Sequence, residues 1–168
     1  NRGGCYASGQ LKTYWAKAST GLSWPTQWIN YFIGPTLHGN IIHTSMPIIS
    51  NLAPGDSIIF EIPWFPPNPS DFSGFGSDSS HFCLLARIET SPVSPYGMTF
   101  PEGPGIYTNV KNNNNIVWKN ITVVDDFTGP TGPMAAGWVT VRNVERDVAL
   151  IKLRFLTPRE QVHNPFQR

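Results

Sequence analysis

Two short β-rich runs constrain the fold of this chain more than any other feature of the sequence. His81–Ile88 reads HFCLLARI, and residues 112–125 read NNNNIVWKNITVVD. Each run has the length and the enrichment in apolar and β-branched side chains that are typical of strands. Neither run carries a catalytic signature. Together they predict a β-sandwich module, a kind of domain that usually connects or binds.

The composition favours many turns and short strands over long helices. The 168 residues include 16 Pro and 15 Gly, and hydrophobic residues make up 40%, enough for a sizeable core. The net charge of +1 gives no electrostatic reason to expect nucleic acid as a partner. No apolar run reaches the length of about 18 residues that a membrane span needs. No motif indicates a cofactor.

Alternating segments define the expected strands. Residues 57–64 alternate cleanly, with four side chains expected to face the core: Ile58, Phe60, Ile62 and Trp64. In the next strand, residues 81–90, the face that carries Leu84 is expected to be the apolar one. Strands at spacings of ten to thirty residues, parted by turn-rich loops, predict an all-β fold. We expect an immunoglobulin-like antiparallel β-sandwich over residues 1–125.

The rest of the chain reads as a linker and a second unit. Residues 126–137 are rich in Gly and Pro, as linkers are. Residues 138–168 then predict the opening strands of a second β-sandwich-like unit with a polar tail. The first strands of the first sandwich are expected to be missing before Asn1. The gap predicts one of three arrangements: a piece of a longer chain, residues 138–155 folding back onto the sandwich, or a subunit that receives a strand from a neighbouring domain or chain.

Several short motifs in the first unit carry a family resemblance. They are Leu-x-x-Tyr-Trp at residues 11–15, Leu-x-Pro-Gly-Asp-Ser at 52–57 before the alternating segment, HFCLLARI, and the late pair Asn114-Asn115. In this order they resemble the CARDB-type (cell-adhesion-related) immunoglobulin-like domains of secreted bacterial multidomain proteins. The resemblance covers roughly residues 1–125, although loops 65–80 and 91–110 are longer than that family's core needs. It implies that Pro54-Gly55 forms the turn before a strand that crosses the sandwich. It also implies a non-catalytic module for adhesion, spacing, or contact with carbohydrate or protein.

The two cysteines bear on the compartment. Low charge and abundant Asn, Ser, Thr, Gly and Pro favour an extracellular or cell-surface protein. In such a compartment, Cys5 and Cys83 are expected to form a disulfide, with two free thiols as the alternative.

Catalytic and metal chemistry have little support in the sequence. His81 stands near Cys83, but a structural role is expected for both. No pair of motifs has zinc-ligand spacing, so no metal site is predicted. The loop from Asp71 to Asp78 leaves calcium binding open, against the simpler view that these are solvated turn acids.

The tryptophans supply the one candidate binding surface. Trp24 and Trp28 lie in a loop with Pro25, where their rings could stack on sugars. Trp15 and Trp64 are instead expected in the core. The first function hypothesis is therefore a non-catalytic extracellular structural or adhesion module, which would serve as an assembly subunit if it borrows a strand. The alternative is an accessory carbohydrate-binding domain of a secreted hydrolase, with a glycan as ligand.

Overall fold

The long first strand organises the fold. In the computed structural model, β1 (Ala7–Lys17) pairs antiparallel with β5 (His81–Glu89), from Gln10 opposite Glu89 to Lys17 opposite Phe82. All elements below belong to the first of two compact units, Asn1–Ala135. The structure describes residues 1–19, 21–43, 45–123, 127–129 and 132–134.

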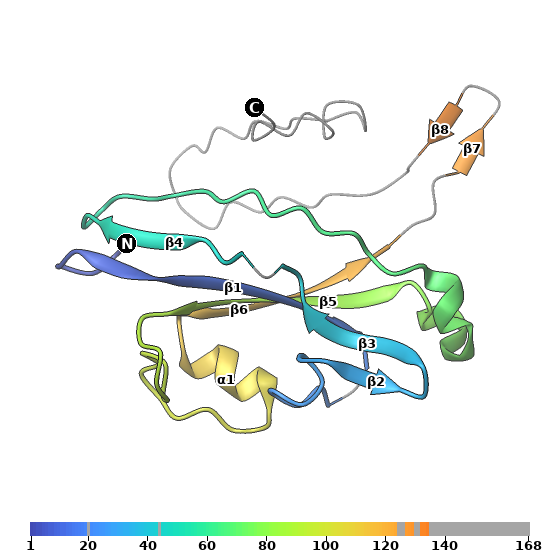
Figure 1. The fold of residues 1–168 in the computed structure, drawn as a ribbon, viewed down its shortest axis with the longest axis horizontal. Helices are drawn as coiled ribbons and strands as arrows, with labels where there is room; N and C mark the ends of the chain where they lie inside the picture. Colours follow the sequence, from blue (N-terminus) through green and yellow to red (C-terminus); the bar gives the residue numbers. More distant parts are fainter. Residues whose placement is uncertain (20, 44, 124–126, 130–131, 135–168) are drawn as a thin grey trace, which may run out of the picture. The chain divides into compact units, whose positions relative to one another are not determined.

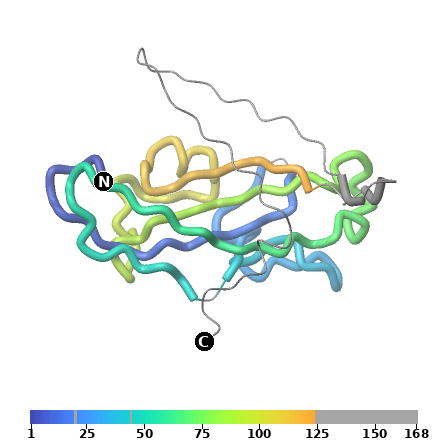
Figure 2. Tube along the Cα trace, turned by 90° about the horizontal axis from the view of Figure 1, so that it is seen from above, coloured from blue at the N-terminus to red at the C-terminus, as the bar shows by residue number. Residues whose placement is uncertain are grey.

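The main sheet has six strands, and every pairing in it is antiparallel. Its order is β2-β3-β1-β5-β6, with β2 at Tyr31–Ile33, β3 at Thr36–Ile41 and β6 at Ile116–Thr122. β4 (Ile48–Leu52) pairs with the first half of β1, while β3 pairs with its second half. Figure 2 shows β1, β5 and β6 running side by side. A separate two-stranded hairpin joins β7 (Phe127–Gly129) to β8 (Gly132–Met134).

Apolar side chains cover both faces of this sheet, because successive residues of a strand point to opposite faces. We call the first group the α1-side cluster, after the short helix α1 (Ile106–Asn112) that contributes to it. Its buried members are Tyr14, Ala16, Leu22, Trp28, Cys83, Leu85, Met98, Ile106 and Ile116. We call the second group the η1-side cluster, after the 3₁₀ helix η1 (Pro69–Asp78). Its buried members are Trp15, Phe72 and Phe82, with Trp64 and Leu84 partly buried against them.

These layers make the fold all-β, antiparallel and sandwich-like, which confirms the predicted fold class. Figure 1 shows the sheet with α1 and its loops on one side and the segment after β4 on the other. The strand predicted within the β-rich run 112–125 corresponds to β6. Among the described helices, none combines the length and the apolar character that crossing a bilayer requires. The predicted strands within 138–168 lie outside the described residues.

The alternating segment 57–64 differs from the prediction. It is extended, yet it forms no hydrogen-bonded strand with any described residue. Phe60, Ile62 and Trp64 are half-buried as expected, but Ile58 is 49% exposed. The period-2 pattern therefore identifies the extended conformation and three of the four inward side chains. It does not reveal that no described strand lies beside the segment to pair with it.

The prediction of a single apolar face for β5 is also too narrow. Ile88, on the face expected to be apolar, is 37% exposed, whereas Leu85 on the other face is 1% exposed. Loops 21–28 and 91–105 and helix α1 cover that second face, and no pattern in the strand itself signals them. Both faces of β5 are core faces over most of their length.

We expect Leu85→Ala to lower the free energy of unfolding by about 2–5 kcal/mol, because it leaves a cavity in a closed cluster. Leu84→Ala should cost less, since Leu84 is only half-buried in the folded chain. Chemical denaturation of the two variants beside the parent measures both values. An equal loss for the two variants would contradict the two-sided core.

Candidate functional site

A buried arginine lies at the centre of the α1-side face. Arg87 on β5 has a fully buried side chain, and its two terminal nitrogens donate to the two oxygens of Glu102 at 2.5 and 2.8 Å. Its Nε donates to Glu89 at 3.3 Å. Lys12 on β1 completes the set, with its Nζ 2.6 Å from Glu89. Two cations and two carboxylates therefore form a chain of ion pairs with no net charge.

Sheet register and two asparagines hold this network in place. Lys12 lies opposite Arg87 in the β1–β5 pairing, which brings the first three groups together. Glu102 comes from a loop, and the loop is fastened on both sides of it. Asn113 exchanges hydrogen bonds with the backbone of Phe100, at 2.9 and 3.3 Å. Asn109 does the same with the backbone of Gly103, at 2.9 and 2.8 Å.

Trp24 covers the arginine from the loop after β1. Its ring lies 4.0 Å from the guanidinium carbon of Arg87, a cation–π contact, and meets Tyr14 edge to face at 5.3 Å. The Trp24 backbone N–H donates to Pro104 at 2.8 Å, which ties this loop to the loop that carries Glu102. The ring is half-buried, so one part of it stays accessible.

The prediction for the second loop tryptophan is wrong. Trp28 is 0% exposed and belongs to the α1-side cluster, so it cannot act as a stacking surface. The loop lies over the sheet, and the ring of Trp28 is buried against the strands. Trp15 lies in the core as expected, at 6% exposed, and Trp64 packs against it with ring centroids 6.4 Å apart.

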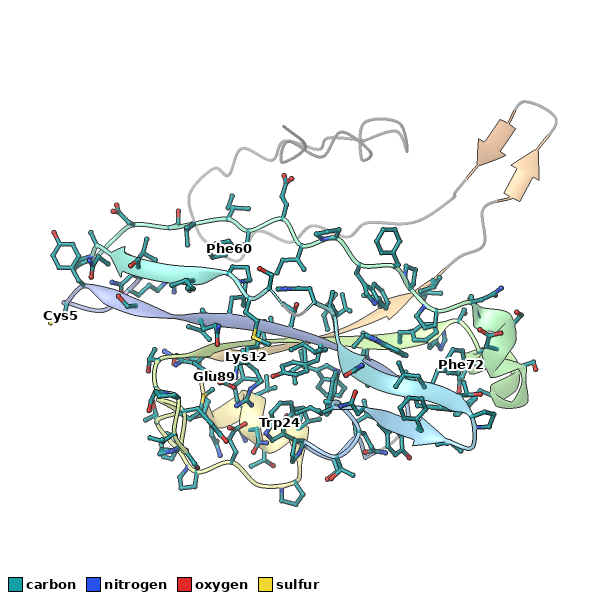
Figure 3. The ribbon with its side chains drawn as sticks, in the orientation of Figure 1. Cys5, Lys12, Trp24, Phe60, Phe72 and Glu89 are labelled. Carbon is teal, nitrogen blue, oxygen red and sulfur yellow. The ribbon has the colours of Figure 1, made fainter. Side chains whose placement is uncertain are left out.

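A cavity opens beside Trp24, and we call it the Trp24 cavity. Its volume is about 550 Å³. Trp24, Tyr14 and Tyr96 supply aromatic walls, and the ion-paired Lys12, Glu89 and Glu102 supply polar ones. Four prolines complete much of the rim: Pro25, Pro95, Pro101 and Pro104. Figure 3 labels Lys12, Trp24 and Glu89 on this side of the sheet.

Burial and the ion pairs set the protonation states in the cavity. Burial raises the pKa of Tyr14 to about 12, the charges of Glu89 and Glu102 add to this, and Arg87 opposes it. Burial alone would lower the pKa of Arg87, but Glu102 and Glu89 raise it above its usual value. At neutral pH the cavity wall therefore contains the protonated phenol of Tyr14, and the charged guanidinium of Arg87 is buried behind that wall. The signal for this site in the sequence is the pair Arg87 and Glu89 at the end of the largely apolar strand β5.

The predicted disulfide is wrong in this structure. Cys5 is an exposed free thiol, and Cys83 is buried and free. Cys83 lies opposite Ala16 near the end of β1, whereas Cys5 precedes its start. The 11 residues of β1 span about 35 Å at about 3.3 Å each, while a disulfide needs Cα atoms within about 7 Å. Figure 3 shows Cys5 at the far end of the strand.

Cys83 has a hydrogen-bonding role and not a catalytic one in this geometry. Its thiol donates to Asn120 on β6 at 3.1 Å, and burial raises its pKa. His81 instead contacts Asp78 at 3.0 Å and is exposed. The hydrogen bond and the raised pKa therefore keep the thiol in its protonated form, and His81 is paired with Asp78.

The loop considered for calcium already accommodates a side-chain cation. Lys17 donates to the backbone oxygens of Asp78 and His81 at 2.5 and 2.6 Å, and its ammonium lies over the rings of Phe75 and Phe82. Burial lowers the pKa of Lys17, and Asp78 opposes that shift. Within the part of the chain that the structure describes, no group of three or more potential metal ligands occurs.

We expect Glu102→Gln to lower the free energy of unfolding by roughly 3–5 kcal/mol, because the buried guanidinium of Arg87 loses a charged partner. Glu61→Gln is the matched control. Because Glu61 is exposed, this substitution should leave the free energy of unfolding unchanged. Urea denaturation of both variants gives the comparison. A loss at Glu102 no larger than that at Glu61 would show that the ion pair does not hold the loop.

A second prediction concerns alkaline pH. A folded-state pKa near 12 lies above the ordinary value of 10.0, so folding favours the protonated phenol. This contribution is complete below pH 10 and is lost as the pH rises toward 12. Between pH 9 and pH 11 the parent should lose roughly 1 kcal/mol more stability than Tyr14→Phe. Parallel denaturation curves at the two pH values measure the difference, and identical losses would contradict the prediction.

Comparisons with known proteins give no relative from which a role could be transferred. No family model matches the chain, and neither a curated protein nor a solved structure does. The CARDB resemblance therefore stays a prediction from short motifs, and the site has to be interpreted from its own geometry.

Proposed function

We propose that this chain is a non-catalytic structural module of an extracellular or surface protein, and that it assembles by pairing an added β-strand. The observation that supports this is the extended segment from Ile58 to Phe65. It has the side-chain alternation of a strand, and its backbone makes no hydrogen bond with another described residue. An extended segment with free N–H and C=O groups is a template for strand addition.

The exposed side chains of this segment are unusually apolar. Ile59 is 88% exposed and Phe65 is 91% exposed, while Phe60, Ile62 and Trp64 face inward and are half-buried. Two large apolar side chains exposed on the same face of one segment indicate a surface that another protein covers. The two ends of the segment are fixed, because Asp56 closes a turn to Ala53 and Asn68 caps η1.

Proline selects which edge of the segment can pair. Backbone N–H groups alternate between the two edges of a strand. Pro63 has no N–H, so the edge that it shares with Ile59, Glu61 and Phe65 is interrupted. The other edge, with the N–H groups of Phe60, Ile62 and Trp64, is continuous. A partner strand should therefore pair along that second edge.

The register of a pairing between two copies follows from these groups. Antiparallel pairing centred on Ile62 joins the continuous edges of both copies. It places the exposed Ile59 of each copy opposite Phe65 of the other, so the two most exposed apolar side chains of the segment cover each other. It also places Glu61 opposite Pro63, which avoids like charges facing each other. We therefore propose that the partner is a second copy of this chain, in a two-fold symmetric arrangement.

Charge variants test both the pairing and its register. Ile59→Lys should weaken dimer formation by roughly tenfold, because a charge replaces an apolar contact twice in the symmetric pair. Adding Phe65→Glu should restore the dimer, since each lysine then faces a glutamate of the other copy. Val93→Lys is the control, because Val93 is 67% exposed in a loop outside the segment. Light scattering of the full chain over a concentration series gives the dissociation constants.

Hydrogen exchange of the same samples reports on the segment itself. We expect amides 60, 62 and 64 to be protected in the dimer and exposed in the Ile59→Lys variant. A parent chain that stays monomeric up to its solubility limit would contradict the proposal. A double variant as weak as the single one would overturn the register, and protection of these amides in a monomer would place the partner strand within the same chain.

A further inference from the structure

We propose that the Trp24 cavity binds a neutral saccharide ring. The site is separate from the segment proposed for assembly, and the inference does not depend on that proposal. Its volume of about 550 Å³ lies in the range of small-molecule sites, about 300–1,000 Å³. Its walls combine aromatic faces, which suit the C–H face of a sugar, with donors and acceptors, which suit its hydroxyls.

A phenol in the cavity wall can serve a ligand. Tyr14 lines the cavity and is 4% exposed, and its hydroxyl is not among the buried side-chain atoms that lack a hydrogen-bond partner. The phenol is protonated at neutral pH, and its raised pKa extends that form to alkaline pH. Its hydroxyl can therefore both donate to and accept from a sugar hydroxyl in the cavity.

The polar wall has unused bonding capacity of both kinds. Glu89 and Glu102 each accept ion-pair hydrogen bonds and still have carboxylate lone pairs free, and the ammonium of Lys12 has further protons to donate. Charge-assisted bonds of this type are the strong ones. Because the ion pairs fix these side chains before a ligand arrives, little conformational entropy remains to be lost on binding.

Charge balance decides the class of ligand. Lys12 and Arg87 cancel Glu89 and Glu102, so the cavity has no net charge to attract a phosphate, a sulfate or an ammonium ion. A proline-rich peptide would also suit aromatic and proline walls, but its backbone offers mainly acceptors. It would leave the carboxylates without donors. A polyhydroxylated neutral ring supplies both.

Two aromatic walls of the cavity come from loops, the loop after β1 and the loop after β5. Trp24 is fixed by its contact with Arg87, and Tyr96 enters from the loop after β5. Tyr96 has φ of 58°, a left-handed conformation that asparagine tolerates better than most residues. Replacing Tyr96 with asparagine therefore removes the ring with little disturbance of the loop backbone.

Glycan binding by the full chain tests the proposal. An array of neutral gluco-, galacto-, manno- and N-acetylhexosamine oligosaccharides is probed first, with sulfated and sialylated glycans and a decaproline peptide beside them. Titration calorimetry with the best neutral glycan then gives the affinity. We expect Tyr14→Phe to weaken binding by about tenfold, since it removes one hydrogen bond and keeps the ring. Tyr96→Asn should weaken it at least as much.

Tyr107→Phe is the matched control, because Tyr107 is 68% exposed on α1 and does not line the cavity. It should bind as the parent does. Melting temperatures verify that each variant is folded, and Tyr96→Asn keeps the test valid if Tyr14→Phe is destabilised. Absence of neutral-glycan binding by the folded parent would overturn the proposal. So would a preference for charged glycans or decaproline, or binding that neither cavity variant changes.

Discussion

The α1-side half of this molecule depends on one buried charge. Arg87 stands in the middle of a strand whose neighbours are apolar, and an unpaired guanidinium there would cost several kcal/mol. The fold supplies Glu89 from the same strand, Glu102 from a loop and the face of Trp24 above. The ion pairs thus draw two loops onto the sheet. The covered core and the Trp24 cavity both follow from that closure.

Closure by loops also explains why a chain with so many turns can bury a sheet on both sides. A sandwich normally covers the inner face of one sheet with a second sheet. Here the described residues cover one face with α1 and its loops and the other with η1 and an extended segment. Buried backbone in such loops needs fixed partners. Asn109 and Asn113 provide them, each through a reciprocal pair of hydrogen bonds to the loop that carries Glu102.

Local patterns in the sequence located some of the strands and did not reveal their surroundings. The β-rich composition located β5 and β6, and period-2 alternation located the inward side chains Phe60 and Trp64, because both are properties of the segment itself. The same alternation predicted a strand over residues 57–64, where the segment is extended but unpaired with any described strand. Burial of Trp28 and separation of Cys5 from Cys83 depend on how loops and strand ends meet in space. Trp24 was identified as a candidate, but its polar partners come from β1, β5 and a distant loop. No spacing rule brings those three together before the register is known.

The two proposed surfaces use opposite faces of the sheet, and this separation has a physical consequence. The segment proposed for pairing includes Trp64, which packs on the η1-side cluster, whereas the cavity opens over Tyr14 of the α1-side cluster. Trp15 and Tyr14 are neighbours on β1 and point to the two faces. Any coupling between the surfaces would have to pass through a strand that is bonded on both edges over this region. Such a strand moves little, so a glycan in the cavity and a partner strand at the other face should bind independently.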